Sequence, residues 1–102
     1  MNKQELAEFM AEKVLDKNAY EFRYDINNVI KFIYSPEGFF AVWDVVDVKF
    51  DYQLQIIISR MAEGTASCRI MDLPPNKILA NIIGKDRYEA FYNAVYEVMK
   101  DE

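Results

Sequence analysis

The sequence predicts an α+β fold, in which three main helices pack with a small antiparallel sheet of about three strands, with an α/β/α sandwich as the alternative. Two observations carry this prediction. Apolar residues recur at helical spacing in three segments, and over residues 49–60 the apolar period changes to two. A length of 102 residues suits one domain, residues 1–102, with a core that needs neither metal nor disulfide.

The clearest helix start lies in the segment Tyr34–Val48. Ser35 is suited to cap a helix, and Pro36 then takes the first helical position, where its missing N–H costs nothing. A strand is the competing interpretation, because the run is rich in valine and phenylalanine. The Ser-Pro-Glu start and the helical spacing of one apolar face favour the helix; that face comprises Phe39, Val42, Trp43 and Val46.

Two further helices are predicted near the ends of the chain. Asn2 and Glu5 have the spacing of a capping box, which predicts a helix over residues 3–16. Asp86 is suited to cap a last helix over residues 87–100. Between the first and the central helix, Tyr20–Tyr24 alternates as a short strand would, and residues 25–33 are ambiguous, with an extended segment favoured over a short helix.

Residues 49–60 and 65–71 are predicted to form an antiparallel hairpin that turns at Gly64. The inward positions of the two strands are Phe50, Tyr52, Leu54, Ile56, Ile58, Ala66, Cys68 and Ile70. The outward positions that look suited to water are Asp51, Gln53, Gln55, Ser59, Thr65, Ser67 and Arg69. Ile57 and Met71 also point outward, so either helices cover one face only or a third layer covers these two residues. Leu73-Pro74-Pro75 is expected to end the sheet, followed by a short helix from Asn76 to Ile83 that Gly84 closes as a left-handed cap.

Composition excludes several classes of function. The formal charge is 12 − 17 = −5, and the basic residues are dispersed, which disfavours binding to nucleic acid. Cys68 is the one cysteine, which suits a reducing cytoplasm, and no apolar run approaches the ~20 residues that span a bilayer. The N-terminal residues lack the apolar core of a signal peptide. The predicted location is therefore cytoplasmic, away from membranes.

The absence of histidine argues most strongly against an enzyme, because it removes the commonest general base and metal ligand. Asp44, Asp47 and Asp51 are spaced three and four apart and invite a Mg²⁺ site, but a solvated helix edge is the favoured interpretation. Cys68 is expected to be a small buried residue rather than a nucleophile. We therefore expect no catalytic, cofactor or metal site.

Tyrosine and outward polar residues supply the candidate sites for a protein partner. Tyrosine combines apolar area with a polar tip, and the predicted outward face of the hairpin offers amide and guanidinium groups. Tyr52, Tyr88 and Tyr92 are expected in the core. The candidate partner-binding residues are Gln53, Gln55, Arg69, Tyr20 and Tyr24.

Three short runs resemble the phage ABA sandwich domain, a family of small phage and prophage proteins. They are Leu6–Leu15, with its Ala-Glu-Lys-Val helix end, Tyr34–Val46, with a Tyr-Ser start before Ala-x-Trp-x-Val-Val, and Tyr88–Val98, which resembles the family's closing helix. The resemblance implies an α/β/α layering and a phage or prophage origin, and it implies no activity.

The resemblance implies a phage or prophage accessory protein, and the small size, acidity and lack of recognisable chemistry fit a non-enzymatic one. Such a protein would bind a host or phage protein, for example to inhibit a bacterial defence system. One alternative is a homo-oligomeric structural or assembly module. The other is a Mg²⁺-dependent carboxylate enzyme centred on Asp44 and Asp47, which is the least favoured.

Overall fold

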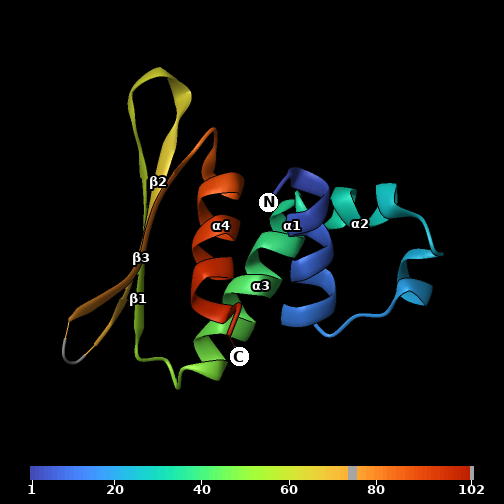
Figure 1. Ribbon diagram of the computed structural model, residues 1–102, viewed down its shortest axis with the longest axis horizontal. Coiled ribbons are helices and arrows are strands. Elements are labelled where there is room, and N and C mark those ends of the chain that lie inside the picture. Colours follow the sequence, from blue (N-terminus) through green and yellow to red (C-terminus); the bar gives the residue numbers. More distant parts are fainter. Residues whose placement is uncertain (74–75, 102) are drawn as a thin grey trace. The chain divides into compact units, whose positions relative to one another are not determined.

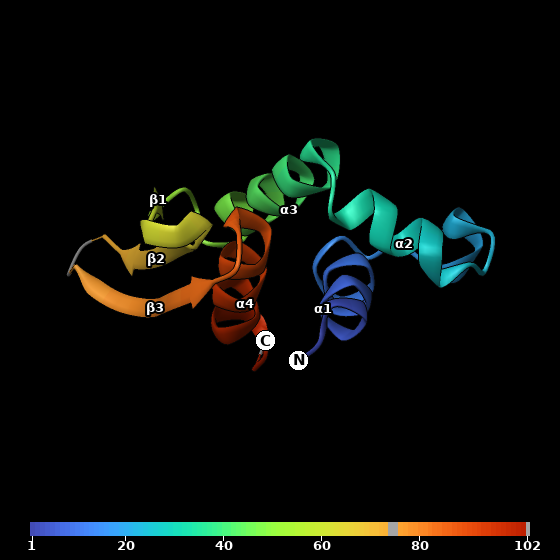
Figure 2. The same cartoon turned by 90° about the horizontal axis from the view of Figure 1, so that it is seen from above.

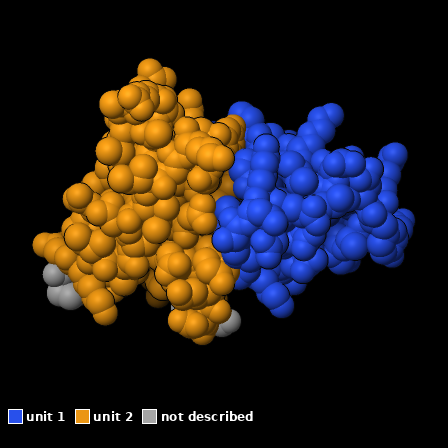
Figure 3. Space-filling model, turned by 45° about the horizontal axis from the view of Figure 1, so that its top comes forward, with its two compact units in different colours: residues 1–46 blue, residues 47–102 orange. Residues whose placement is uncertain are grey.

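The computed structural model describes residues 1–73 and 76–101, and in this part of the chain four α-helices accompany a three-stranded antiparallel sheet (Figure 1). This confirms the α+β fold class. The contacts within the chain divide it into two compact units, residues 1–46 and 47–102 (Figure 3). Each unit is described by itself, and the single domain expected from the length stays a prediction.

The first unit begins with α1 (Lys3–Phe9), which continues directly as the π-helical turn η1 (Met10–Val14). The predicted capping box is confirmed: the Asn2 side chain accepts a hydrogen bond from the Glu5 N–H at 2.8 Å, and the Glu5 carboxylate accepts one from the Asn2 N–H at 3.1 Å. In the π-helical turn the Leu15 N–H donates to the carbonyl of Met10, five residues earlier, at 2.9 Å.

The strand predicted at Tyr20–Tyr24 is wrong, because Ala19–Phe22 form the 3₁₀ turn η2. Asn18 and Glu21 make a second capping box, in which each side chain accepts a hydrogen bond from the backbone N–H of the other residue. This arrangement stabilises the start of a helical turn and does not occur along a strand. The alternating aromatics also do not share a face. Phe22 is buried, whereas Tyr20 and Tyr24 are 74% and 77% exposed.

Residues 26–33 form the helix α2 (Ile26–Ile33) rather than the extended segment that the sequence favoured. The Asp25 carboxylate caps it by accepting a hydrogen bond from the Asn27 N–H at 2.9 Å. The apolar residues Ile26, Val29, Ile30 and Ile33 follow the i, i+3, i+4, i+7 spacing of one helix face.

The central helix is confirmed as α3 (Pro36–Lys49). Ser35 caps it as predicted, since its Oγ accepts a hydrogen bond from the Gly38 N–H at 3.3 Å. The predicted apolar face is also confirmed: Phe39, Val42 and Val46 are buried and Trp43 is half-buried.

The second unit contains the sheet, with strands β1 (Leu54–Arg60), β2 (Ala66–Asp72) and β3 (Lys77–Gly84) in the order β1-β2-β3, all antiparallel. The predicted hairpin is confirmed, with Ile56 opposite Ile70 and Ile58 opposite Cys68. Its turn places Glu63 and Gly64 at positive φ (62° and 79°), a conformation that glycine adopts readily.

Strand β1 starts five residues later than predicted, because α3 runs through Lys49. A turn follows, in which Asp51 and Tyr52 both have positive φ. The core position predicted for Tyr52 is therefore wrong: its side chain is 73% exposed. Within β1 the predicted alternation holds, since Leu54, Ile56 and Ile58 are less exposed than the residues between them.

The short helix predicted at Asn76–Ile83 is wrong, because these residues belong largely to β3, the third strand of the sheet. The segment is rich in β-branched isoleucine, and β2 offers it an unpaired edge. The sheet thus does not end at Leu73, and Pro74 and Pro75 lie outside the described residues. Gly84 is not a left-handed cap either; of the glycines in the described chain, Gly64 has positive φ.

Helix α4 (Arg87–Met99) lies along one face of the sheet and contacts all three strands (Figure 2). The predicted cap is confirmed, with the Asp86 carboxylate accepting a hydrogen bond from the Glu89 N–H at 2.9 Å. The buried residues of the helix are Ala90, Phe91, Tyr92, Ala94, Val95 and Met99, whereas Tyr88 is half-buried. The buried residues of the sheet include Ala66, Cys68, Ile70 and Ala80, which share the face toward α4.

Candidate interaction surfaces

The sheet has a second face, which points away from α4 and which we call the open face. The register places its side chains in three rows across the strands: Gln55–Met71–Ile78, Ile57–Arg69–Asn81 and Ser59–Ser67–Ile83. Ile57, Ile78 and Ile83 are 39%, 52% and 64% exposed. The exposed side chains rule out a layer of this unit over the open face, so the α/β/α alternative does not describe residues 47–102.

The open face has an unusual balance of charge for an acidic chain. The net charge of the whole chain is −5. The nine residues of the three rows include Arg69 and no aspartate or glutamate, so this part of the described surface carries a formal charge of +1. The open face thus combines three exposed isoleucines with a central arginine.

The structure brings two of the predicted partner-binding residues together. Gln55 and Arg69 are exposed and lie on the open face in neighbouring rows of adjacent strands. Gln53 is also exposed and precedes β1, where its carbonyl accepts a hydrogen bond from the Leu73 N–H at 2.9 Å. The sequence reasoning missed Ile78 and Ile83, because it placed them in a helix instead of a strand.

Tyr20 and Tyr24 belong to the other unit. Their rings contact each other edge to face, with centroids 6.5 Å apart. Both side chains are exposed, and their part in binding a partner stays a prediction.

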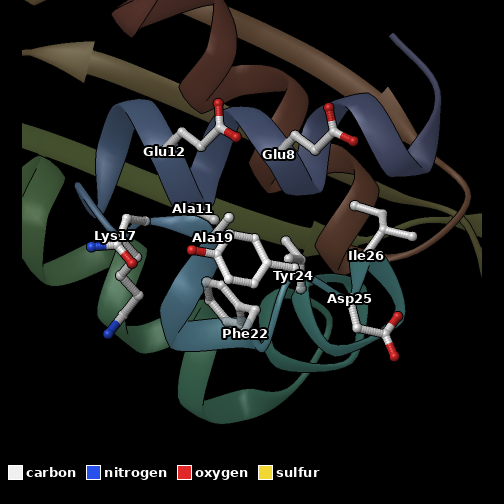
Figure 4. Close-up of a pocket in the computed structure, with 11 residues that line it drawn as sticks. Glu8, Ala11, Glu12, Lys17, Ala19, Phe22, Tyr24, Asp25 and Ile26 are labelled. Carbon is white, nitrogen blue, oxygen red and sulfur yellow. The ribbon is translucent and has the colours of Figure 1, made fainter.

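A pocket of about 280 Å³ lies in the first unit (Figure 4). Its walls come from α1 and η1 on one side and from η2, α2 and the turn between them on the other. The lining residues are Glu8, Ala11, Glu12, Lys17, Asn18, Ala19, Phe22, Tyr24, Asp25, Ile26 and Val29. Tyr24 thus joins the exposed tyrosine pair to the pocket.

The remaining candidate chemical groups are the three aspartates at the end of the central helix and the single cysteine. Within residues 1–73 and 76–101, no three histidine, cysteine, aspartate or glutamate side chains are grouped to hold a metal, so Asp44, Asp47 and Asp51 do not form such a site. Cys68 is fully buried, as predicted, and burial raises the pKa of its thiol to about 12. A protonated, inaccessible thiol is a poor nucleophile.

Among the helices of the described residues, none combines the length and apolarity needed to cross a bilayer. Comparison with models of protein families, with curated proteins and with solved structures found no match to this chain. The resemblance to the phage ABA sandwich domain therefore stays a prediction.

Proposed function

We propose that this chain is a non-enzymatic protein-binding module and that the open face of its sheet is the contact surface. The observation that carries the proposal is the set of three exposed isoleucines around Arg69. Covering an exposed isoleucine completely contributes about 1.5–3 kcal/mol, so partial burial of three can supply a substantial part of a binding free energy.

The charge of the open face specifies the partner's chemistry. With one guanidinium and no carboxylate among its nine residues, the face suits an apolar surface that carries an aspartate or glutamate. Arginine can bind a carboxylate through two parallel hydrogen bonds, and arginine is enriched among the residues that dominate binding energies. Arg69 is therefore the proposed anchor, with Ile57 beside it.

The biological setting of the proposal rests on the resemblance to small phage proteins. We place the chain in the cytoplasm of a bacterial host, as an accessory protein of a phage or prophage that binds a host or phage protein. Inhibition of a bacterial defence system is the role that a small acidic binding protein without recognisable chemistry would suit.

The test is affinity capture from a lysate of the bacterium that carries the gene, followed by titration of the captured protein in purified form. The chain with Gln55→Arg and Arg69→Glu should lose at least about tenfold in affinity, because it reverses the anchoring charge. The matched control is Gln4→Arg with Lys13→Glu, which makes the same net change in charge at exposed positions of the first unit. Equal binding by both double variants would remove the open face from the proposal.

Self-association is the second candidate function, and the exposed isoleucines favour it as well. A homo-oligomeric module would show a concentration-dependent mass at neutral pH, and removing open-face isoleucines with Ile57→Gln and Ile83→Gln would lower that mass. The central Arg69 weighs against it, because two copies stacked face to face about this residue would bring like charges together.

A further inference from the structure

The pocket in the first unit combines apolar walls with a polar rim. Its apolar surface comes from Ala11 and Ala19 on either side, from the buried ring of Phe22, and from Ile26 and Val29 on α2. In Figure 4, Glu8 and Glu12 project side by side from the first helix, with their carboxylates turned away from the rings of Phe22 and Tyr24. A group that binds here meets apolar and aromatic surface inside the pocket and carboxylates at its rim.

The size of the pocket limits what it can hold. About 280 Å³ is several times the ~30 Å³ share of one water molecule, but lies just below the range of pockets that enclose drug-sized ligands. The space therefore fits a single amino-acid side chain or a small organic molecule, and it is too small for a nucleotide.

The charges of the rim select a cation. The pocket is lined by the carboxylates of Glu8, Glu12 and Asp25 and by one cationic residue, Lys17. Lys17 already has a carboxylate partner outside the pocket, since its Nζ lies 3.5 Å from the Glu21 carboxylate. That nitrogen also lies 5.7 Å from the centroid of the Phe32 ring.

The three carboxylates differ in the hydrogen bonds that they already accept. Asp25 caps α2, and Glu8 accepts a hydrogen bond from the Gln4 amide at 3.2 Å. Over the described stretch of the chain, Glu12 has neither a salt bridge nor a side-chain hydrogen bond. Glu8 and Glu12 are four residues apart on continuous helix, so a cation between them would also relieve their repulsion.

We propose that this pocket binds an organic cation with an apolar stem, an alkylammonium or alkylguanidinium group. The stem lies against Phe22, Ile26 and Val29, and the charged head lies between Glu8 and Glu12. The two sources of this chemistry are a lysine or arginine side chain of another protein and a free small amine. The site lies in the first unit and does not depend on the open face.

The test is an NMR titration of the labelled full chain with three probes of equal chain length: butylammonium, butanol and butyrate. Butylammonium should shift the amide signals of Ala11, Ala19 and Tyr24, and butyrate should leave them in place. The Glu8→Gln, Glu12→Gln double variant should bind butylammonium roughly five- to tenfold more weakly, because two charge partners are lost.

The matched control is Glu37→Gln with Glu63→Gln, which removes the same two charges at exposed positions outside the pocket lining. Its affinity for butylammonium should equal that of the unaltered chain. Equal weakening in the two double variants, or equal shifts with butyrate, would overturn the proposal by showing non-specific attraction to an acidic chain. No shift at the three amides would overturn it as well.

Two further probes distinguish the sources. Tighter binding of Nα-acetyl-lysine amide than of 1,4-diaminobutane would identify the side chain of a partner protein as the ligand. The reverse order would identify a free amine. Either result supports the pocket as a cation site, and failure here leaves the open-face contact untouched because the pocket residues Glu8 and Glu12 belong to the first unit.

Discussion

The buried Cys68 thiol makes the stability of this protein depend on pH in alkaline solution. Burial raises the pKa of the thiol in the folded chain to about 12, from an ordinary value of 9.0. The folded state thus holds the proton more tightly than the unfolded state. The protonated thiol therefore contributes to the free energy of unfolding. This contribution, as much as about 4 kcal/mol, is fully present below pH 9 and is lost as the pH rises toward 12.

Urea unfolding of the unaltered chain and of Cys68→Ala checks this effect. Below pH 9 the variant should be less stable by about 1 kcal/mol, because it leaves a small cavity in the core. Above pH 9 the unaltered chain should lose stability faster, so the two curves should converge or cross. Parallel curves over the whole range would contradict an alkaline role for the buried thiol.

The helix caps are the individual residues whose structural role the sequence predicts best. Asn2, Ser35 and Asp86 were each identified correctly, because a cap requires a particular side chain at a particular place. Positive φ at Asp51 and Tyr52 was missed. These residues rarely adopt that conformation by local preference, so the neighbouring helix and strand impose it.

Among the helices, the long α3 and α4 could be predicted and the shorter α2 and η2 could not. The apolar period over α3 or α4 repeats often enough to be unambiguous, whereas α2 has eight residues and η2 has four. Strand β3 was missed for a different reason. Its residues Ile78–Ile83 fit either period, and pairing with β2 decides between them. Part of the open face belongs to β3. The sequence therefore predicts the residues that β1 and β2 contribute to this face but not those of β3.

The contact between β3 and α4 depends on Gly84. A Cβ atom at this position would lie 2.5 Å from the backbone nitrogen of Ala90 and 3.0 Å from its Cα, and backbone atoms cannot rotate away. Gly84→Ala should therefore destabilise the protein by about 1–3 kcal/mol. Asn81→Ala, at an exposed position of the same strand, should change stability by no more than about 0.5 kcal/mol.

Thermal unfolding followed by circular dichroism measures both Gly84→Ala and Asn81→Ala. A melting temperature of Gly84→Ala within error of the unaltered chain would mean that α4 can move away from the strand end at little cost. The Asn81 variant controls for a general sensitivity of β3 to substitution.

At the scale of the whole molecule, net charge and the open face act in opposite directions on association. A charge of −5 at pH 7 makes copies of the chain repel one another, and this repulsion vanishes near the isoelectric point of about 4.7. The exposed isoleucines remain at every pH. We therefore expect a monomer at neutral pH and association through the open face as the pH approaches 4.7.

Light scattering from pH 7 down to the isoelectric point tests this expectation. The Ile57→Gln, Ile83→Gln variant keeps the charge of the chain but removes apolar area from the open face, so it should associate less than the unaltered chain near pH 4.7. The control Val48→Gln, Met61→Gln removes exposed apolar side chains elsewhere and should associate like the unaltered chain. If all three chains gain mass equally, loss of charge alone drives association. A large mass at pH 7 that the open-face variant abolishes would instead establish self-association as the function of the sheet.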